Sequence, residues 1–229
     1  MKFPRMSKRL KQYFKENVFE STHEVVPRLY DFALILIQSN TNGKGLIINF
    51  GCGPFPVELN ARLMNLHDGF STRFLNIDIS QKACIRHKEA MGEMVEKHKN
   101  QFSTDIYLNV DIERVKAQAM RKVLKGEEPQ GGLAISFLEY YSPQRVVKVI
   151  TKMLQHCNSL VCSVRIDPES EKTFDMENHL KLYFFKDLEE LRSNLNHEAW
   201  KIEKIRGVPR FSDGERGIFL MLIRSTDGS

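Results

Sequence analysis

The residues best suited to chemistry are a glycine-rich turn, Gly51-Cys52-Gly53, and an acid that follows it along the chain. Glycine lets the backbone turn sharply after an apolar run (LIINF) and lets a ligand approach the main chain, because no Cβ is in the way. Asp78 closes a second apolar run (RFLNIDI), 27 residues beyond Gly51. In nucleotide-binding folds a carboxylate at that place accepts hydrogen bonds from ribose hydroxyls. An ordinary turn or a helix cap could explain either feature alone, but together they predict a nucleoside pocket.

Such a pocket needs a sheet whose strand ends gather the turn and the acid at one edge. Strand-like runs lie at residues 46–49, 73–79, 105–110, 133–137, 159–166, 200–205 and 217–224. Helical patterns lie at residues 5–19, 24–38, 57–66, 81–97, 112–124, 143–155 and 173–196. This alternation predicts an α/β, Rossmann-like fold with a mostly parallel seven-stranded sheet, ending in an antiparallel hairpin because only a loop joins the last two strands. We expect residues 1–42 to be an N-terminal helical extension and residues 43–229 to form the binding domain.

Composition narrows the class of protein. The chain has 229 residues, 41% of them hydrophobic and 28% charged, which suits one globular domain. It shows no signal-peptide pattern and no apolar run near the ~20 residues of a membrane helix. The cysteines and histidines lack metal-site spacing or a catalytic triad, so we expect buried reduced thiols, no bound metal and a cytoplasmic protein. His87 and Glu89 are expected on the solvated face of a charged helix.

Positive charge gathers at the N-terminus of a chain with net charge +5 and a pI near 9.0. The basic residues there are Lys2, Arg5, Lys8, Arg9, Lys11 and Lys15. Such a block could neutralise nucleic-acid phosphates. Apolar residues recur between them at helical spacing, so the segment also fits an amphipathic helix with a solvated basic face. Charge alone leaves RNA binding open.

The motifs around the turn and the acid resemble the signatures of class I S-adenosylmethionine-dependent methyltransferases. LIINFGCGPFP is similar to the first signature and FLNIDIS to the second. The resemblance implies S-adenosylmethionine as cofactor, with its methionine end along the glycine turn, its ribose held by Asp78 and its adenine near Asp111, where a helix cap is an equal alternative. The cofactor-binding residues implied are Asn49, Gly51, Cys52, Gly53, Asp78, Ile79, Asp111, Ile112 and Phe137.

One residue departs from the family pattern. Where the family usually has an acid closing the first strand, this chain has Asn49. Asparagine can accept a hydrogen bond but cannot offset the positive charge of the cofactor. The departure therefore leaves open weak cofactor binding, or a binding module that does not catalyse.

A narrower resemblance concerns the substrate. STHEVVPRLYDF, before the first strand, and SVRIDPESEKTFDMENHLKLYFF are similar to segments of the aminoglycoside-resistance methyltransferases, and Pro56 and Leu59 follow the turn as in that family. This resemblance implies methylation of guanine N7 in small-subunit ribosomal RNA. That atom has an exposed lone pair, so the enzyme mainly aligns the base with the methyl group.

The residues expected to meet the acceptor follow the fourth and fifth strands. They are Glu139, Tyr140, Tyr141 and Arg165, beside Phe137. The aromatic side chains could stack a base and Arg165 could meet a phosphate, although rim packing and plain surface exposure are alternatives. Methyl or aminocarboxypropyl transfer to a small molecule also fits these residues. The oligomeric state is not predicted.

Overall fold

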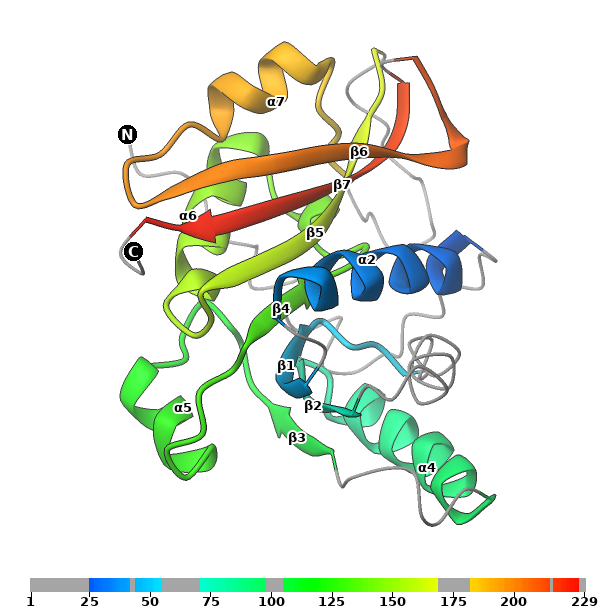
Figure 1. Ribbon diagram of the computed structural model, residues 1–229, viewed down its shortest axis with the longest axis vertical. Coiled ribbons are helices and arrows are strands. Elements are labelled where there is room, and N and C mark those ends of the chain that lie inside the picture. The colour runs from blue at the N-terminus through cyan, green and yellow to red at the C-terminus, as the bar shows by residue number, and fades with distance from the viewer. Residues whose placement is uncertain are drawn as a thin grey trace.

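A computed structural model of the chain describes residues 25–41, 44–54, 71–97, 105–168, 182–214 and 216–226. Its strands form one sheet in the order β3-β2-β1-β4-β5-β7-β6 (Figure 1). Strands β1 to β5 pair in parallel, whereas β7 runs antiparallel to both β5 and β6. The strands are β1 (Lys44–Phe50), β2 (Ser71–Asp78), β3 (Ile106–Asn109), β4 (Gly131–Ala134), β5 (Ser159–Ile166), β6 (Trp200–Asp213) and β7 (Arg216–Ser225). The predicted fold class is confirmed.

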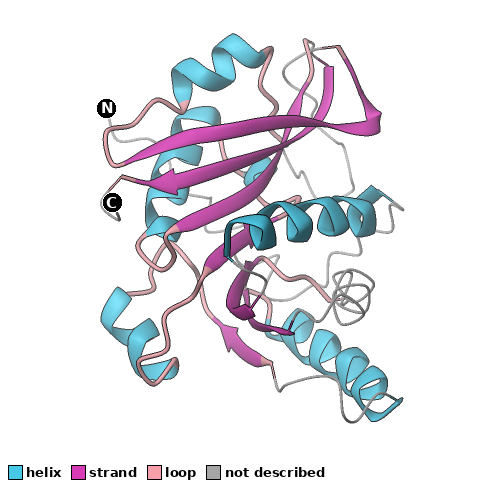
Figure 2. Cartoon of the chain, viewed as in Figure 1, coloured by secondary structure: helices cyan, strands magenta, loops and turns pink. Residues whose placement is uncertain are grey.

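Helices cover this sheet, as Figure 2 shows. They are α2 (Val25–Thr41), α4 (Gln81–Lys97), α5 (Ala117–Val123), the short 3-10 helix η1 (Leu138–Tyr140), α6 (Pro143–Leu154) and α7 (Leu188–Asn194). None of these described helices is long and apolar enough to cross a membrane. The helices expected at residues 5–19 and 57–66 lie outside the described residues, as do the basic N-terminus, Pro56 and Leu59.

The core has two layers, one on each face of the sheet. In β1, Ile47 packs in the layer that contains α2, whereas its neighbour Ile48 packs in the layer that contains α6 and α7. Successive strand residues point to opposite faces, so a strand covered on both sides needs an unbroken apolar run. This explains why Leu46, Ile47, Ile48 and Phe50 are all apolar; Asn49, the polar residue among them, is buried as well and is hydrogen-bonded inside the protein.

The parallel register brings the carboxyl ends of the first strands together. Asn49 of β1 is paired with Asn76 of β2, and Asp78 of β2 with Asn109 of β3. The glycine turn after β1, the loop after β2 and the loop after β3 therefore share one edge of the sheet. In open α/β sheets this edge is where ligands bind.

One predicted strand ends earlier, and one predicted helix begins later, than the sequence pattern indicates. The strand expected at residues 133–137 stops at Ala134, because Ser136 has a left-handed φ of 50° and its N–H donates to Ser163 Oγ at 2.7 Å instead of continuing the ladder. The helix expected at residues 112–124 begins only at Ala117, because residues 112–114 form a turn on Asp111.

The predicted helix at residues 173–196 is wrong over its described part before α7. Residues 182–185 form an extended segment, because Tyr183 N–H donates to Glu139 O at 2.8 Å and Phe185 N–H to Arg165 O at 3.0 Å. Helix α7 starts afresh at Leu188, where the Asp187 side chain accepts a hydrogen bond from Glu190 N at 2.7 Å. An N-cap of this kind fixes a helix start.

A buried histidine makes stability depend on pH. His156, just after α6, is 7% exposed, and neither ring nitrogen has a hydrogen-bond partner in the described part of the chain. Burial, helped by the charge of Lys152, lowers the pKa of His156 to about 4. The unfolded chain takes up this proton near pH 6.5, whereas the folded chain resists it until about pH 4. Folding stability is therefore complete above pH 6.5 and is lost as the pH falls toward 4.

We expect His156→Leu to remove about 2 kcal/mol of the stability difference between pH 7 and pH 5. The reason is that leucine neither titrates nor buries unpaired nitrogens. Urea unfolding at both pH values, followed by fluorescence of the single, buried Trp200, measures the effect. An equal pH dependence in the variant and the wild type would show that other groups cause it.

Candidate functional site

The glycine turn is held against the next strand by its backbone. The N–H groups of Gly51 and Cys52 both donate to Ile77 O, at 2.7 and 3.1 Å. Gly51 and Gly53 have left-handed φ values of 69° and 66°, which side chains rarely adopt. A Cβ on Gly51 would lie 2.3 Å from Phe137 Cδ2, whereas one on Gly53 would meet no atom of the described residues within 4 Å. The space beside Gly51 is thus occupied by the Phe137 ring, whereas the space beside Gly53 is open among the described residues.

Asp78 meets this turn. Its Oδ2 accepts a hydrogen bond from Gly53 N at 3.0 Å, and its Oδ1 accepts one from Ser80 N at 2.8 Å. A carboxylate has about four lone-pair sites, so roughly two remain for a ligand. Burial raises the pKa of the Asp78 carboxyl above its usual range, and the two N–H groups only partly offset this. The structure therefore brings the predicted turn and acid together in one place.

His87 also lies here, and its predicted place on a solvated face is wrong. The side chain is 0% exposed, Nδ1 is 3.2 Å from Gly53 O, and the ring packs edge-on against Tyr107. His87 is four residues from both Ala83 and Met91, which are buried on the same stripe of α4. That i, i+4 spacing was the signal in the sequence. Glu89 is exposed, as expected.

The cysteine of the turn is buried beside a second cysteine. Cys52 contacts Cys84 of α4, and a hydrogen bond between the two thiols lowers the pKa of Cys84. The Cys84 thiol also lies 3.8 Å from Leu108 O. All four cysteines of the chain are buried free thiols.

Asn49 points into the core. Its Oδ1 accepts a hydrogen bond from Tyr30 Oη at 2.9 Å, and its Nδ2 donates to Asn76 Oδ1 at 3.0 Å. The side chain is fully buried, so its polar atoms are used by the protein rather than displayed at the edge of the sheet. A cofactor-binding role for Asn49 remains a prediction.

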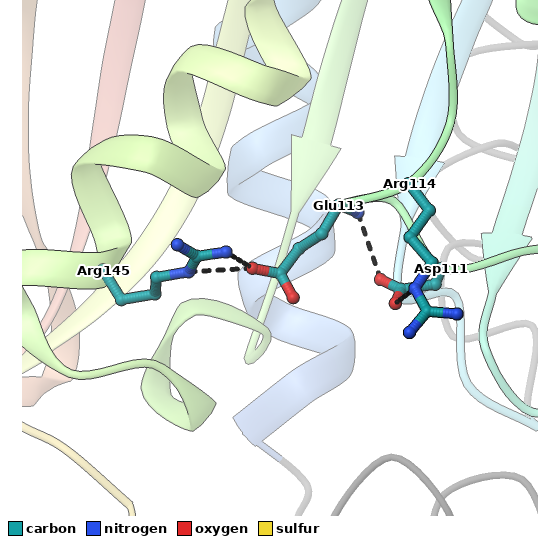
Figure 3. Close-up of polar contacts among 4 residues, drawn as sticks. All are labelled: Asp111, Glu113, Arg114 and Arg145. Carbon is teal, nitrogen blue, oxygen red and sulfur yellow. Dashed lines mark hydrogen bonds and ion pairs between the residues drawn. The ribbon is translucent and has the colours of Figure 1, made fainter. Parts of the chain in front are cut away.

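Two further predicted residues lie after β2 and β3. Half-buried Ile79 accepts a hydrogen bond through its carbonyl from Asn109 Nδ2 at 2.8 Å. Asp111 Oδ1 accepts one from Glu113 N at 3.1 Å, and Asp111 Oδ2 lies 3.4 Å from Arg114 Nε (Figure 3). Ile112 is buried in the core layer on the α6 side. Asp111 therefore closes its own turn, which fits the helix-cap alternative and leaves adenine binding as a prediction.

An ion pair ties this turn to α6. Arg145, in the first turn of α6, donates from Nε to Glu113 Oε1 at 2.8 Å, and its terminal nitrogen contacts the same oxygen (Figure 3). The two side chains are only 14% and 7% exposed. The pair therefore holds the loop after β3 against the helix that follows η1.

The predicted acceptor residues lie around η1. Phe137 packs on Gly51 and lies 5.5 Å, ring to ring, from the buried Tyr141. Burial raises the pKa of Tyr141. Tyr140 is half-buried against the core on the α6 side. Phe137 thus packs beside the glycine turn, with Tyr141 against its ring.

Glu139 and Arg165 meet at a narrow pocket that encloses about 10 Å³, roughly the space of one water molecule. Tyr141 lines this pocket, and so do Tyr183 and Phe185 from the extended segment before α7. The sequence reasoning missed these last two residues because it placed them in a helix. Tyr140 is not among the described residues that line the pocket.

The two glycines of the turn predict different costs for the same substitution. We expect Gly51→Ala to destabilise the protein by about 2–3 kcal/mol, because a Cβ would overlap the Phe137 ring as well as strain the backbone. Gly53→Ala carries only the backbone strain and should cost about 1 kcal/mol. Urea unfolding followed by Trp200 fluorescence measures both. Equal costs would mean that Phe137 does not pack on Gly51 in solution.

Comparisons with known proteins bear on the fold. No family model matches the chain, and no curated protein sequence does. Magnesium protoporphyrin IX methyltransferase (ChlM) from Synechocystis PCC 6803, solved with S-adenosylhomocysteine, is 13% identical, with a TM-score of 0.59 over 94% of this chain and 92% of that chain. The Burkholderia thailandensis 1,6-didemethyltoxoflavin-N1-methyltransferase, solved with 1,6-didemethyltoxoflavin and S-adenosylhomocysteine, is 12% identical, with a TM-score of 0.61 over 96% and 88%.

A third similar structure is the [4+2]-cyclase SpnF, 13% identical, with a TM-score of 0.54 over 85% of this chain and 80% of that chain. Its name shows that the fold does not fix the reaction. The narrower resemblance to the aminoglycoside-resistance methyltransferases finds no support in these comparisons. What they do establish is architecture: the chain has the Rossmann-like fold of the class I S-adenosylmethionine-dependent methyltransferases.

Proposed function

We propose that the chain is an S-adenosylmethionine-dependent methyltransferase that acts on a small-molecule acceptor. The observation that carries the proposal is the meeting of Gly53 with the Asp78 carboxylate, at a place where a Cβ on Gly53 would meet no atom of the described part of the chain within 4 Å. An acid with spare lone pairs beside a backbone that a ligand can approach is what a nucleoside requires.

The residues present fit the cofactor. When bound, S-adenosylmethionine supplies an electrophilic methyl group on a positively charged sulfur. Asp78 would accept hydrogen bonds from its ribose, and the backbone of the glycine turn would lie along its methionine end. Ile79, Asp111 and Ile112 would lie on the adenine side, since they follow β2 and β3 at the same edge of the sheet. Phe137 would then separate the cofactor from the acceptor.

The acceptor is a small molecule rather than RNA. The narrow pocket beside η1 is lined, apart from Glu139 and Arg165, by uncharged side chains rather than by the basic surface that nucleic acid requires. The two methyltransferases compared above are named for small acceptors, magnesium protoporphyrin IX and 1,6-didemethyltoxoflavin.

Calorimetric titration of the full chain with S-adenosylmethionine, with S-adenosylhomocysteine, and with NAD as a control tests the cofactor. We expect micromolar binding of the first two, about −8 kcal/mol, and none of NAD. Incubation with methyl-tritiated S-adenosylmethionine and either a low-molecular-weight cell extract or ribosomal RNA tests the acceptor. Label is expected in the extract. Label confined to RNA, or no cofactor binding, would contradict the proposal.

A further inference from the structure

Two cysteines from different elements meet at the glycine turn. Cys52 is the central residue of the turn, and its N–H donates to Ile77 O at 3.1 Å. Cys84 lies in the first turn of α4, and its Sγ is 4.0 Å from Asp78 O. The two residues are thus anchored at neighbouring carbonyl groups of β2, and their thiols share a hydrogen bond. Sulfur atoms in such contact need to approach by only about 2 Å to form a disulfide.

The other two cysteines differ from this pair, because neither has a thiol partner within the described residues. The Cys157 thiol donates to Met153 O at 3.6 Å, and Cys162 lies within β5. Burial raises the pKa of both thiols, that of Cys157 to about 12.

Cys84 is the thiol best suited to react first. The hydrogen bond with Cys52 lowers the pKa of Cys84, and the nearby His87 adds to this, against the opposing effects of burial and the Asp78 charge. A place in the first turn of a helix also favours a thiolate. Because the thiolate is the form that attacks peroxides, Cys84 is expected to be oxidised before the other cysteines.

Resting on the proposed function, we propose that Cys52 and Cys84 are a redox pair that hydrogen peroxide closes to a disulfide, and that this disulfide lowers the affinity of the cofactor site. The Cys84 thiolate attacks one peroxide oxygen, so that an S–O bond forms as the O–O bond breaks, and the released hydroxide takes the proton that Cys84 lost. The Cys52 sulfur then attacks Cys84: the S–S bond forms, the S–O bond breaks, and the second hydroxide leaves with the Cys52 proton. Hydrogen peroxide is thereby reduced to two waters while the two thiols lose two electrons, and a dithiol reductant reverses the change.

The place of Cys52 explains how the disulfide reaches the cofactor site. The next residue, Gly53, donates its N–H to Asp78 Oδ2 at 3.0 Å. Cys84 is fixed in a helix, where its N–H donates to Ser80 O at 3.1 Å, whereas glycines flank Cys52 and make its backbone easier to deform. The turn is therefore the part that moves when the sulfur atoms approach, and this movement takes Gly53 N away from the Asp78 carboxylate.

Cofactor binding and disulfide formation then oppose each other. Loss of one hydrogen bond to a charged group corresponds to about ten-fold in affinity. A ligand that binds the dithiol form ten-fold more tightly than the disulfide form shifts the equilibrium between the two forms by about the same factor. For a two-electron couple this is about 30 mV, so saturating S-adenosylhomocysteine should raise the reduction potential of the pair by that amount in a glutathione redox buffer.

Burial of the pair selects a small oxidant. Cys52 and Cys84 are only 3% and 6% exposed, which disfavours attack on a bulky disulfide such as oxidised glutathione. Hydrogen peroxide is close to water in size and needs far less room. We therefore expect peroxide to close the pair much faster than the redox buffer does.

Peroxide oxidation of the full chain tests both halves of the proposal. The reduced protein is treated with hydrogen peroxide, catalase removes the excess, and one sample is blocked with N-ethylmaleimide for non-reducing peptide mapping. We expect the intact chain to lose two hydrogen atoms and the map to contain a cross-linked Cys52–Cys84 peptide pair. Calorimetric titration of the second sample with S-adenosylhomocysteine should give a dissociation constant about ten-fold higher than in the reduced protein. Dithiothreitol, which does not reduce methionine sulfoxide, should restore the affinity.

Two variants assign the effect, each compared before and after peroxide. In Cys84→Ser the affinity should not respond to peroxide, because no disulfide can form, whereas Cys157→Ala keeps the pair and should respond as the wild type does. Absence of the Cys52–Cys84 cross-link, a cross-link that leaves affinity unchanged, or an equal loss of affinity in Cys84→Ser would overturn the proposal. If the reduced wild type does not bind S-adenosylhomocysteine at all, the proposed function fails and the cofactor half of this proposal fails with it, while the peptide map still decides whether the two cysteines are a redox pair.

Discussion

Replacing Asp78 with alanine is expected to weaken S-adenosylmethionine binding at least about 100-fold. Hydrogen bonds to a charged group contribute about 1.5–3 kcal/mol each, and Asp78 has lone pairs for two ribose hydroxyls. The substitution also removes the acceptor for Gly53 N, which holds the open end of the glycine turn. Both losses fall on the cofactor, so affinity should fall far more than stability. Calorimetric titration of the wild type and the variant measures the change.

Asp105→Ala is the matched control. Asp105 Oδ1 also accepts a backbone hydrogen bond, from Phe74 N at 3.0 Å, but it lies before β3, at the opposite edge of the sheet from the glycine turn. Affinity in this variant should stay within about two-fold of the wild type, because it loses a similar contact outside the site. Unchanged affinity in Asp78→Ala, or an equal loss in both variants, would mean that Asp78 does not hold the ribose.

The same carboxylate gives cofactor binding a pH dependence. Because burial raises the pKa of Asp78, its charged form is lost at a higher pH than in an exposed aspartate. Affinity should therefore be full at neutral pH and fall as the pH drops through the raised pKa. Asp78→Asn removes this titration, so its weaker binding should not change over the acidic range.

Much of the fold could be predicted because its signals are local. Continuous apolar runs mark buried parallel strands, and the glycine turn with Asp78 marks the carboxyl edge of the sheet. Those signals predicted the ends of β1, β2, β5 and β7 to within two residues. Strand β6 begins where it was predicted but extends to Asp213, well beyond its predicted end at residue 205. The same signals predicted the site residues that lie at strand ends, namely the glycine turn after β1 and Asp78 at the end of β2.

The errors arose where distant residues decide the local structure. Helical periodicity before α7 is overridden by the backbone hydrogen bonds of Tyr183 and Phe185 to Glu139 and Arg165. His87 looks solvated beside charged neighbours, yet it is fully buried because α4 packs that face on β2 and β3. The backbone partners of Tyr183 and Phe185 lie 44 and 20 residues away, and His87 contacts Gly53 and Tyr107, 34 and 20 residues away, so no local pattern contains these contacts.

Asn49 shows a different limit. Its type departs from the family pattern, but only the structure shows that its amide joins Tyr30 and Asn76 in the core. A charged acid buried there would need stronger compensation than a neutral amide. The departure is thus accounted for by packing, without requiring a loss of catalysis.

We expect the buried Arg145–Glu113 ion pair to contribute more to the free energy of unfolding than the half-exposed pair Arg73–Glu127. Removing one partner of a buried pair leaves an uncompensated charge, so Arg145→Ala should lower the free energy of unfolding by about 3–5 kcal/mol. Arg73 and Glu127 are 35% and 36% exposed, so solvent screens their interaction and Arg73→Ala should cost less than about 1 kcal/mol. Urea unfolding followed by Trp200 fluorescence measures both.

A double substitution tests whether the cost of each single variant comes from leaving one buried charge without its partner. In Arg145→Met with Glu113→Leu no buried charge remains, so the loss should be well below the sum of the two single losses. The single variants should also weaken S-adenosylmethionine binding, because Glu113 lies in the turn that Asp111 closes and Arg145 fixes that turn to α6. Additive losses, or a cost for Arg145→Ala no larger than for Arg73→Ala, would show that the pair is solvated and does not hold the loop after β3.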